Sequence, residues 1–135
     1  MSGAPSVPAD GLRLVLAESA DQVSRARRAV RDWLRSAGLH IHEPTAELLV
    51  SELVTNALRH GRPPVELRLR AAPEKVLRIE VLDTADGADP VQTHAAVDAV
   101  SGRGLGIVAA LAVRWGTEHL DSGKVVWAEL DPSSR

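Results

Sequence analysis

The chain has 135 residues, a length that suits one domain with a substantial core and leaves little room for a second. Its 44% hydrophobic and 25% charged residues are ordinary for a globular protein, and the formal net charge of -2 argues against a dedicated nucleic-acid binder. The sequence has no cysteine, phenylalanine or tyrosine, which excludes disulfide bonds, thiolate metal sites and most aromatic platforms for base stacking.

The amino-terminal stretch differs from the rest of the chain. Residues 1–10 are rich in proline, serine, glycine and alanine and offer nothing to bury, so we expect a disordered tail followed by one domain over residues 11–131. This tail lacks the basic and apolar regions of a signal peptide, and no later segment reaches the length of a membrane span. We therefore expect a cytoplasmic protein without a membrane partner.

A strand and a helix are predicted first. Alternating leucines at residues 12–16 indicate a strand with one face on the core. A helix should follow, because residues 19–22 have the form of a capping box and Gly38 is placed to end a helix. The apolar residues of this helix are Val23, Ala26, Val30, Trp33, Leu34 and Ala37. Its opposite face, which is either solvated or a docking patch for an acidic partner, carries Arg25, Arg28, Arg31 and Arg35.

The segment from Glu47 to Gly61 predicts the central helix, with Pro44 suited to its first turn. Its apolar stripe consists of Ala46, Leu49, Val50, Leu53, Val54, Ala57 and Leu58. Glu52 and Asn56 lie one turn apart at the border of this stripe. They could simply mark where the buried face ends. Alternatively, Asn56 could hold Mg²⁺, and Glu52 could orient a water or accept a hydroxyl proton.

Two half-buried strands follow. The alternation of apolar residues predicts strands at residues 65–70 and 77–83, with a turn at residues 71–75 between them. Asp83 has the parity of the apolar residues before it, so its carboxylate should point toward the covered face of the sheet. A buried carboxylate needs a donor. That donor could be a backbone amide at the strand end or the exocyclic amine of a bound base.

A long loop and a glycine-rich segment come next. From residue 84 to residue 101 the pattern weakens, with room for one or two helical turns around residues 93–100, and loops of this length are usually functional or mobile. Gly102, Gly104 and Gly106 then lead into an apolar helix. Such glycines let backbone N–H groups approach a phosphate, or they serve only close helix packing. The apolar residues of this helix are Val108, Leu111, Ala112 and Trp115.

The last two strands are expected at residues 113–120 and 124–130, joined by a hairpin turn. Because helices of this pattern would cover one side of the four strands from residue 65 onward, the sequence predicts a two-layer α/β sandwich. We expect the first strand, at residues 12–16, to lie at an edge of the sheet.

Three segments, in this order, resemble the GHKL ATPase superfamily: E-L-V-T-N at residues 52–56, the strand ending in Asp83, and G-R-G-L-G-I at residues 102–107. With its ELVTNALRHG and closing G-K-x-V-W-A-E-L, the chain is most similar to bacterial anti-sigma factor serine/threonine kinases. The resemblance extends over residues 12–130. It implies a Bergerat-type ATP-binding fold, in which helices cover one face of a mixed, mostly antiparallel α+β sheet.

The resemblance also implies roles for particular residues. Asn56 matches the Mg²⁺ ligand, Glu52 the residue that activates the attacking hydroxyl, and Asp83 the adenine reader, beneath a lid formed by residues 84–101. Further nucleotide contacts are implied for Gly87, Gly102, Arg103, Gly104, Leu105 and Gly106. Such kinases bind a sigma factor and release it according to whether they have phosphorylated an anti-anti-sigma (STAS-type) protein, and they often form homodimers.

The chain departs from the superfamily pattern at two positions. Ala85 stands where a glycine usually follows the adenine-reading aspartate, and Val125 stands where a threonine often supports the adenine contact. A second function therefore stays open, that of a partner-binding module that does not transfer phosphate. A detached catalytic domain of a histidine kinase is disfavoured, because no helix pair bearing a phosphoacceptor histidine is present.

Overall fold

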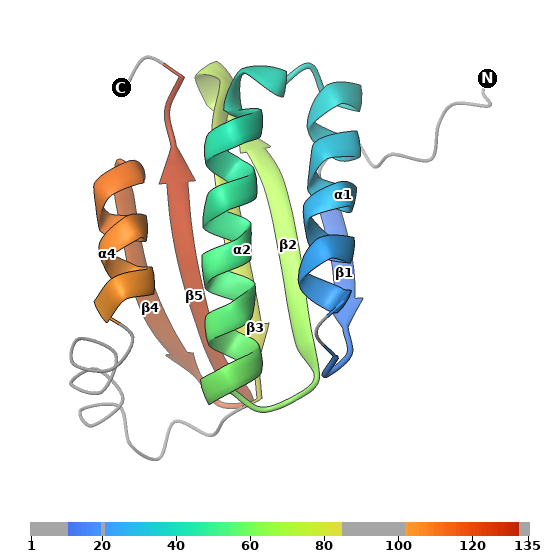
Figure 1. Ribbon diagram of the computed structural model, residues 1–135. Coiled ribbons are helices and arrows are strands. Elements are labelled where there is room, and N and C mark those ends of the chain that lie inside the picture. The colour runs from blue at the N-terminus through green and yellow to red at the C-terminus, as the bar shows by residue number, and fades with distance from the viewer. Residues whose placement is uncertain (1–10, 20, 85–101, 133–135) are drawn as a thin grey trace.

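The computed structural model has a layer of helices on one face of a five-stranded sheet (Figure 1). It describes residues 11–19, 21–84 and 102–132. The predicted tail and all of the predicted lid after Thr84, with its helical turns, Ala85 and Gly87, therefore lie outside the described residues. The main elements are β1 Leu12–Leu16, α1 Asp21–Ser36, α2 Glu43–His60, β2 Val65–Ala72, β3 Val76–Asp83, α4 Gly102–Leu111, β4 Arg114–Leu120 and β5 Gly123–Leu130.

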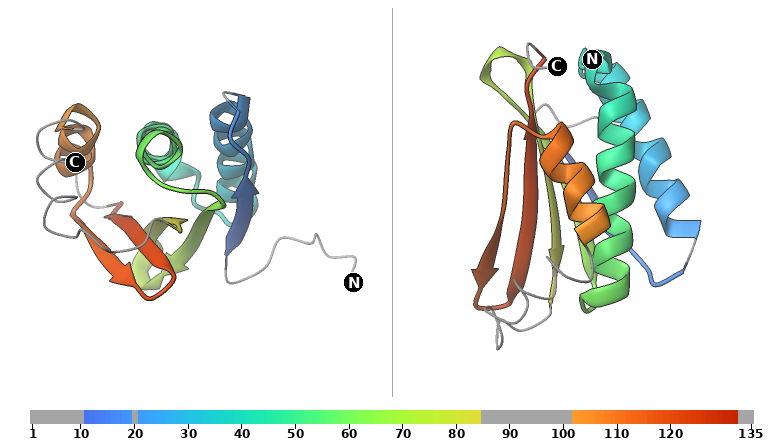
Figure 2. Two further views of the ribbon diagram at one scale, coloured as in Figure 1. Left: turned by 90° about the horizontal axis from the view of Figure 1, so that it is seen from below. Right: turned by 60° about the vertical axis from the view of Figure 1, so that its left-hand side comes forward.

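The strand order is β1-β2-β3-β5-β4, and each neighbouring pair is antiparallel. The first strand lies at an edge, as predicted, and the views in Figure 2 show the helices on a single face of the sheet. Leu67 is opposite Val81, and Val81 is opposite Val126, so one apolar row crosses the sheet beneath the helices. The two-layer fold class is therefore confirmed, although the strand pairs of the described residues are all antiparallel, so the sheet is not mixed as expected. Among the described residues, no helix is both long enough and apolar enough to cross a membrane.

Helix α1 ends as predicted but begins differently. Gly38 adopts a φ of 73°, and the Leu39 amide donates to the Leu34 carbonyl at 2.8 Å, which closes a Schellman motif. At the start, the side-chain oxygen of Gln22 accepts a hydrogen bond from the Ala17 amide at 3.1 Å. In the predicted capping box it would accept from the Ser19 amide instead. The glutamine therefore holds the strand-to-helix connection, and the predicted box arrangement is wrong.

Two arginines that we expected on the outer face of α1 instead tie it to α2. Arg31 donates to both carboxylate oxygens of Glu47 at 3.0 Å, and Arg35 donates to those of Glu43 at 2.9 and 3.0 Å. These hydrogen bonds hold the pKa values of the Glu47 and Glu43 carboxyls below their ordinary range. The side chains of Arg31 and Arg35 are still 37% and 62% exposed and Arg28 is exposed, in line with the predicted solvated face, but the ion pairs mean that Arg31 and Arg35 do not form a free docking patch.

The buried face of α2 matches the predicted stripe, except that Leu58 is only half-buried. Helix α4 is shorter than predicted, because it ends at Leu111 and Trp115 belongs to β4. The reason is that the chain joins the sheet at once: the Val113 amide donates to the Glu129 carbonyl at 2.9 Å. Trp115 then packs on the core from the sheet.

The uncovered face of the sheet carries a charged and aromatic cluster. The Arg78 guanidinium lies 4.3 Å from the ring centroid of Trp127 and donates to Glu129 at 2.9 Å. Trp127 packs against the backbone of Gly116, where an added Cβ would lie 3.2 Å from the indole. Burial raises the pKa of the Glu129 carboxyl, but hydrogen bonds from Arg78 and Arg114 outweigh burial and leave this pKa lowered.

The Arg31–Glu47 pair generates a pH-dependent prediction. Because the pKa of Glu47 is lowered in the folded state, its contribution to stability is present above the ordinary value of 4.5 and is lost as the pH falls through the lowered value. We expect Glu47→Gln to lower the free energy of unfolding by about 0.5 kcal/mol at neutral pH. This deficit should vanish in acid, as measured by urea unfolding over a pH series.

Glu118→Gln serves as the matched control, because Glu118 is exposed on β4 and has no ion pair with any described residue. The control should match the wild type at every pH. If Glu47→Gln still lowered the free energy of unfolding at low pH, the attraction between the charges of Arg31 and Glu47 would not be the source of the stabilisation.

Candidate functional site

Glu52 and Asn56 lie on the flank of α2 that faces α4. Thr45 marks this flank, because it borders a hollow together with Ala110 and Leu111 of α4. Glu52 and Asn56 follow Thr45 by seven and eleven residues, which places them two and three turns further along the same side. Both are half-buried, as expected for the border of the stripe. The structure therefore turns these two polar side chains toward the neighbouring helix.

Helix α4 runs antiparallel to α2, so its N-terminus lies beside the second half of α2 (Figure 1). Leu111, near the end of α4, lies at the level of Thr45. Both helices rise about 1.5 Å per residue, so Gly102, about nine residues before Leu111, comes level with the part of α2 between Glu52 and Asn56. The predicted phosphate-binding segment and the predicted Mg²⁺ ligand are thus brought side by side.

The three predicted phosphate-loop glycines belong to the helix itself. Gly102 is the first residue of α4, so Gly104 and Gly106 lie in its first turns and not in a preceding loop. A Cβ added to Gly106 would meet no atom of the described residues within 4 Å, so packing against this part of the chain does not explain the glycine. The first amides of a helix have no partner within the helix and form a natural anion site. The side chains of Arg103 and Leu105 lie outside the described part.

Asp83 is buried, with 4% of its surface exposed, on the helix-covered side of β3. It packs against the end of α2: a Cβ on Gly61 would lie 2.5 Å from Oδ2 of Asp83. The connection is fixed further by Thr84, whose amide donates to the Arg62 carbonyl at 2.9 Å and whose hydroxyl donates to the Pro63 carbonyl at 2.8 Å. Gly61 therefore belongs to the site, although its sequence position indicated only the end of a helix.

The register of β5 corrects the expectation for Val125. Val125 is opposite Leu82, so its side chain points to the face away from Asp83. Lys124 is opposite Asp83, and Val126 is opposite Val81, which places both on the same side as the Asp83 carboxylate. A change of one residue in the pairing register moves every side chain of a strand to the other face, and the geometry of the hairpin turn sets this register. Lys124, with 8% exposed, is the residue of this site that sequence reasoning missed.

Among the described residues, no group of three or more histidine, aspartate or glutamate side chains could hold a metal ion. Mg²⁺ binds with few protein ligands when phosphates and water supply the others. An ion held through Asn56 would therefore need a bound polyphosphate. The Asn56 and Glu52 side chains fit this requirement, because neither has a hydrogen-bond partner among the described residues.

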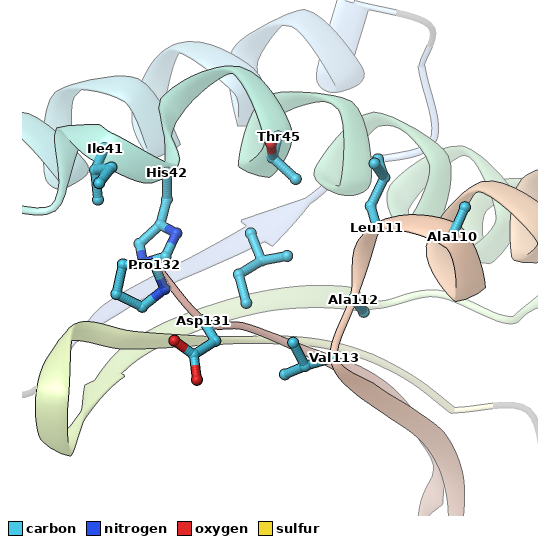
Figure 3. A pocket seen from close by; sticks show the side chains of 10 residues that line it. Ile41, His42, Thr45, Ala110, Leu111, Ala112, Val113, Asp131 and Pro132 are labelled. Carbon is cyan, nitrogen blue, oxygen red and sulfur yellow. The ribbon is translucent and has the colours of Figure 1, made fainter. Parts of the chain in front are cut away.

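A hollow of about 960 Å³ lies near the opposite end of α4 (Figure 3). It is bordered by apolar side chains that include Ile41, Leu111 and Val113, and by His42, whose Nε2 lies 2.7 Å from the Lys75 carbonyl. None of the predicted site residues borders it. This hollow is therefore distinct from the site formed by the end of β3, the second half of α2 and the start of α4.

A sequence profile described as the histidine kinase-like ATPase domain matches residues 16–130. The crystal structure of the RsbU and RsbW domains of Rv1364c from Mycobacterium tuberculosis shares the fold, with a TM-score of 0.68 and 20% identity over 92% of this chain and 33% of that chain. The histidine kinase domain of the blue-light activated histidine kinase EL346 from Erythrobacter litoralis has a TM-score of 0.56 and 21% identity, over 83% and 60% of the two chains.

The chain therefore spans about a third of the first solved structure and three fifths of the second. No curated protein sequence matches it.

The close approach of Gly61 and Asp83 generates a second prediction. Gly61→Ala should lower the free energy of unfolding by about 1 to 3 kcal/mol, because the methyl group would overlap the Asp83 carboxylate and the Ala57 carbonyl. Gly106→Ala is the control, since its methyl group would meet no atom of the described residues and should stabilise α4 by up to about 1 kcal/mol. Urea unfolding measures both. Equal effects of the two substitutions would contradict the tight contact at Gly61.

Proposed function

Because the chain belongs to the histidine kinase-like ATPase family, we propose that it binds ATP with Mg²⁺ and transfers the terminal phosphoryl group to a serine or threonine of a partner protein. The observation that carries this proposal is the convergence of three elements at one place. Asp83 ends β3, Glu52 and Asn56 face α4, and the N-terminus of α4 comes level with them.

Asp83 is suited to read the base. Its carboxylate accepts hydrogen bonds, and the exocyclic amine of adenine donates them. The residue is 4% exposed, so a hydrogen bond formed there would be shielded from water and correspondingly strong. Because Gly61 has no side chain, the Asp83 carboxylate has room beside the end of α2. Gly87, which the family resemblance also assigns to nucleotide binding, lies outside the described residues.

The start of α4 is suited to hold the phosphates. Its first amides and the helix dipole favour negative charge, and the absence of side chains at Gly102, Gly104 and Gly106 lets an anion approach the backbone. Arg103 and Leu105 belong to this same segment and are proposed as nucleotide contacts. Asn56 would supply its side-chain oxygen to Mg²⁺, which neutralises the charge that develops on the phosphates during transfer.

Glu52 is proposed as the catalytic base. The hydroxyl oxygen of the partner's serine or threonine attacks the γ-phosphorus of ATP, the bond from this phosphorus to the bridging oxygen breaks, and ADP leaves. The Glu52 carboxylate takes the hydroxyl proton. Glu52 lies one turn before Asn56 on the same flank of α2. Its carboxylate is available for this step, because it has no hydrogen-bond partner among the described residues.

The partners are proposed to be a sigma factor and an anti-anti-sigma (STAS-type) protein, so that phosphorylation of the second controls release of the first. This role is supported by the ELVTNALRHG and G-K-x-V-W-A-E-L motifs and by the fold shared with the structure of the RsbU and RsbW domains. A homodimer is part of the same proposal.

One observation favours a second function, that of a partner-binding module that holds nucleotide without transferring phosphate. The β5 residues nearest to Asp83 on the same side of the sheet are Lys124 and Val126, and neither has the hydroxyl that the family resemblance leads us to expect beside the base. In that case Asn56→Ala would leave partner release unchanged in the presence of ATP and Mg²⁺.

Separate roles for Glu52 and Asn56 give a third prediction. Glu52→Gln should keep ATP affinity but lower the rate of phosphoryl transfer by about 10² to 10⁴, the usual contribution of a general base. Asn56→Ala should abolish the increase in ATP affinity on adding Mg²⁺. Transfer from radiolabelled ATP to a candidate STAS-type protein measures the rate.

Thr55→Ala is the control for both variants, because Thr55 is exposed on the same helix between the two residues. It should retain wild-type transfer. Full transfer activity in both Glu52→Gln and Asn56→Ala would rule out the proposed mechanism.

A further inference from the structure

The face of the sheet that the helices leave uncovered concentrates positive charge beside the edge strand β1 (Figure 2). A hollow of about 540 Å³ lies there, bordered by the side chains of Arg13 on β1, Arg68 and Arg70 on β2, and Glu80 on β3. These residues alternate along their strands with buried apolar residues, so their side chains point away from the helices. Three guanidinium groups and one carboxylate thus meet at one place, in a chain whose formal net charge is -2.

The register explains why the surface is hollow here. Leu12 is opposite Leu69, so Gly11, one residue earlier, lies beside Arg70. A Cβ added to Gly11 would overlap the Leu69 carbonyl oxygen and lie 3.3 Å from the Cβ of Arg70, and the φ of 149° at this position favours glycine. Gly11 therefore leaves open a space beside Arg70 that a side chain would fill.

Pairing within the sheet does not account for the grouping of the arginines. Arg13 is directly opposite Arg68, and Arg70 is directly opposite Arg78. Like charges directly opposite each other in an antiparallel pair destabilise the sheet. Two such pairs lie next to each other at this end of the sheet, so the arrangement opposes stability unless negative charge compensates it.

Glu66 compensates two of the arginines at once. The Nε groups of Arg13 and Arg68 both donate to the same oxygen of Glu66, each at 2.8 Å. The Arg13 side chain is nevertheless 72% exposed, and ion pairs so open to water contribute little to stability. Two positive charges therefore share one negative charge at the surface.

Arg70 has the loosest ion pair of the three arginines. A terminal nitrogen of Arg70 lies 3.9 Å from a carboxylate oxygen of Glu80, which is beyond the length of a hydrogen bond. The same oxygen accepts a hydrogen bond from Arg78 at 2.7 Å. The Arg70 side chain is 61% exposed, so its guanidinium can meet an incoming anion without first losing a hydrogen bond to Glu80.

From these observations we infer that the uncovered face beside β1 binds an acidic segment of a partner protein, whose carboxylates are received by Arg13, Arg68 and Arg70. A guanidinium group forms two parallel hydrogen bonds with a carboxylate, and three such groups around one hollow suit successive acidic side chains. This surface and the proposed nucleotide site lie on opposite faces of the sheet. The inference goes beyond the proposed function and does not depend on ATP binding.

A protein segment suits this surface better than a nucleic acid or a second copy of the chain. None of the described residues that border the hollow is aromatic, and the ring of Trp127 on the same face is already covered by the Arg78 guanidinium at 4.3 Å. Bases would therefore find no free ring on which to stack. A two-fold contact with a second copy would bring the arginines of both copies together. The competing explanation is that the arginines only keep an uncovered sheet face hydrated.

The test is fluorescence titration of the wild type and R13Q/R70Q with a labelled polyglutamate peptide at low ionic strength. Arg13 and Arg70 are mostly exposed, so the double variant should fold, which circular dichroism checks. We expect R13Q/R70Q to bind the peptide about tenfold more weakly, because charge-assisted hydrogen bonds to carboxylates are lost. Added salt should weaken binding by the wild type.

R28Q/R59Q is the matched control, because it removes the same charge from two exposed arginines of the helix layer. The control should bind polyglutamate as the wild type does. Wild-type affinity in R13Q/R70Q, an equal loss in R28Q/R59Q, or no binding by the folded wild type would each overturn the inference.

Two further measurements separate the other occupants of this face. Tighter binding of single-stranded oligothymidylate than of polyglutamate, lost in R13Q/R70Q, would overturn the inference in favour of a nucleic acid. Self-association of the wild type that R13Q/R70Q abolishes, measured by sedimentation, would overturn it in favour of a second copy. R13Q/R70Q should bind ATP with wild-type affinity, so failure of the ATP site and failure of this surface can be told apart.

Discussion

The contact between the end of β3 and the end of α2 is the constraint on which the site depends. Asp83 can be buried there because Gly61 has no side chain, and Thr84 anchors the same junction through the carbonyls of Arg62 and Pro63. This contact fixes the carboxylate just beyond the last turns of the helix that carries Asn56. A buried acceptor and a half-buried amide are thereby held on two rigid elements, as a preorganised binding site requires.

The two flanks of α2 have different roles. On one flank, Arg31 and Arg35 of α1 hold Glu47 and Glu43 in two-pronged ion pairs, so these acids serve the packing of two helices. On the other flank, the polar groups that face α4 have no partner among the described residues, and the start of α4 lies beside them. The acids that pair with α1 and the proposed catalytic acid Glu52 thus point in different directions from one helix.

Local patterns predicted much of this arrangement. The helical period alone places Glu52 and Asn56 at the border of the buried face, and strand alternation alone directs Asp83 to the core side. Sequence could not show which acid each α1 arginine would meet, because that depends on how two helices pack. The face of Val125 was misjudged for a similar reason: the hairpin sets the register, and one residue of shift exchanges the faces. The Gly61–Asp83 approach is likewise a tertiary contact between distant segments.

The most direct test of the central claim is calorimetric titration of the wild-type chain and Asp83→Asn with ATP and Mg²⁺, after circular dichroism has shown that both are folded. Saturable binding by the wild type that is lost in the variant is the result the account predicts, because the asparagine amide would present a donor to the donating amine of the base. Equal binding by the two proteins would place the nucleotide elsewhere, and an absence of binding by the folded wild type would contradict the ATP site itself.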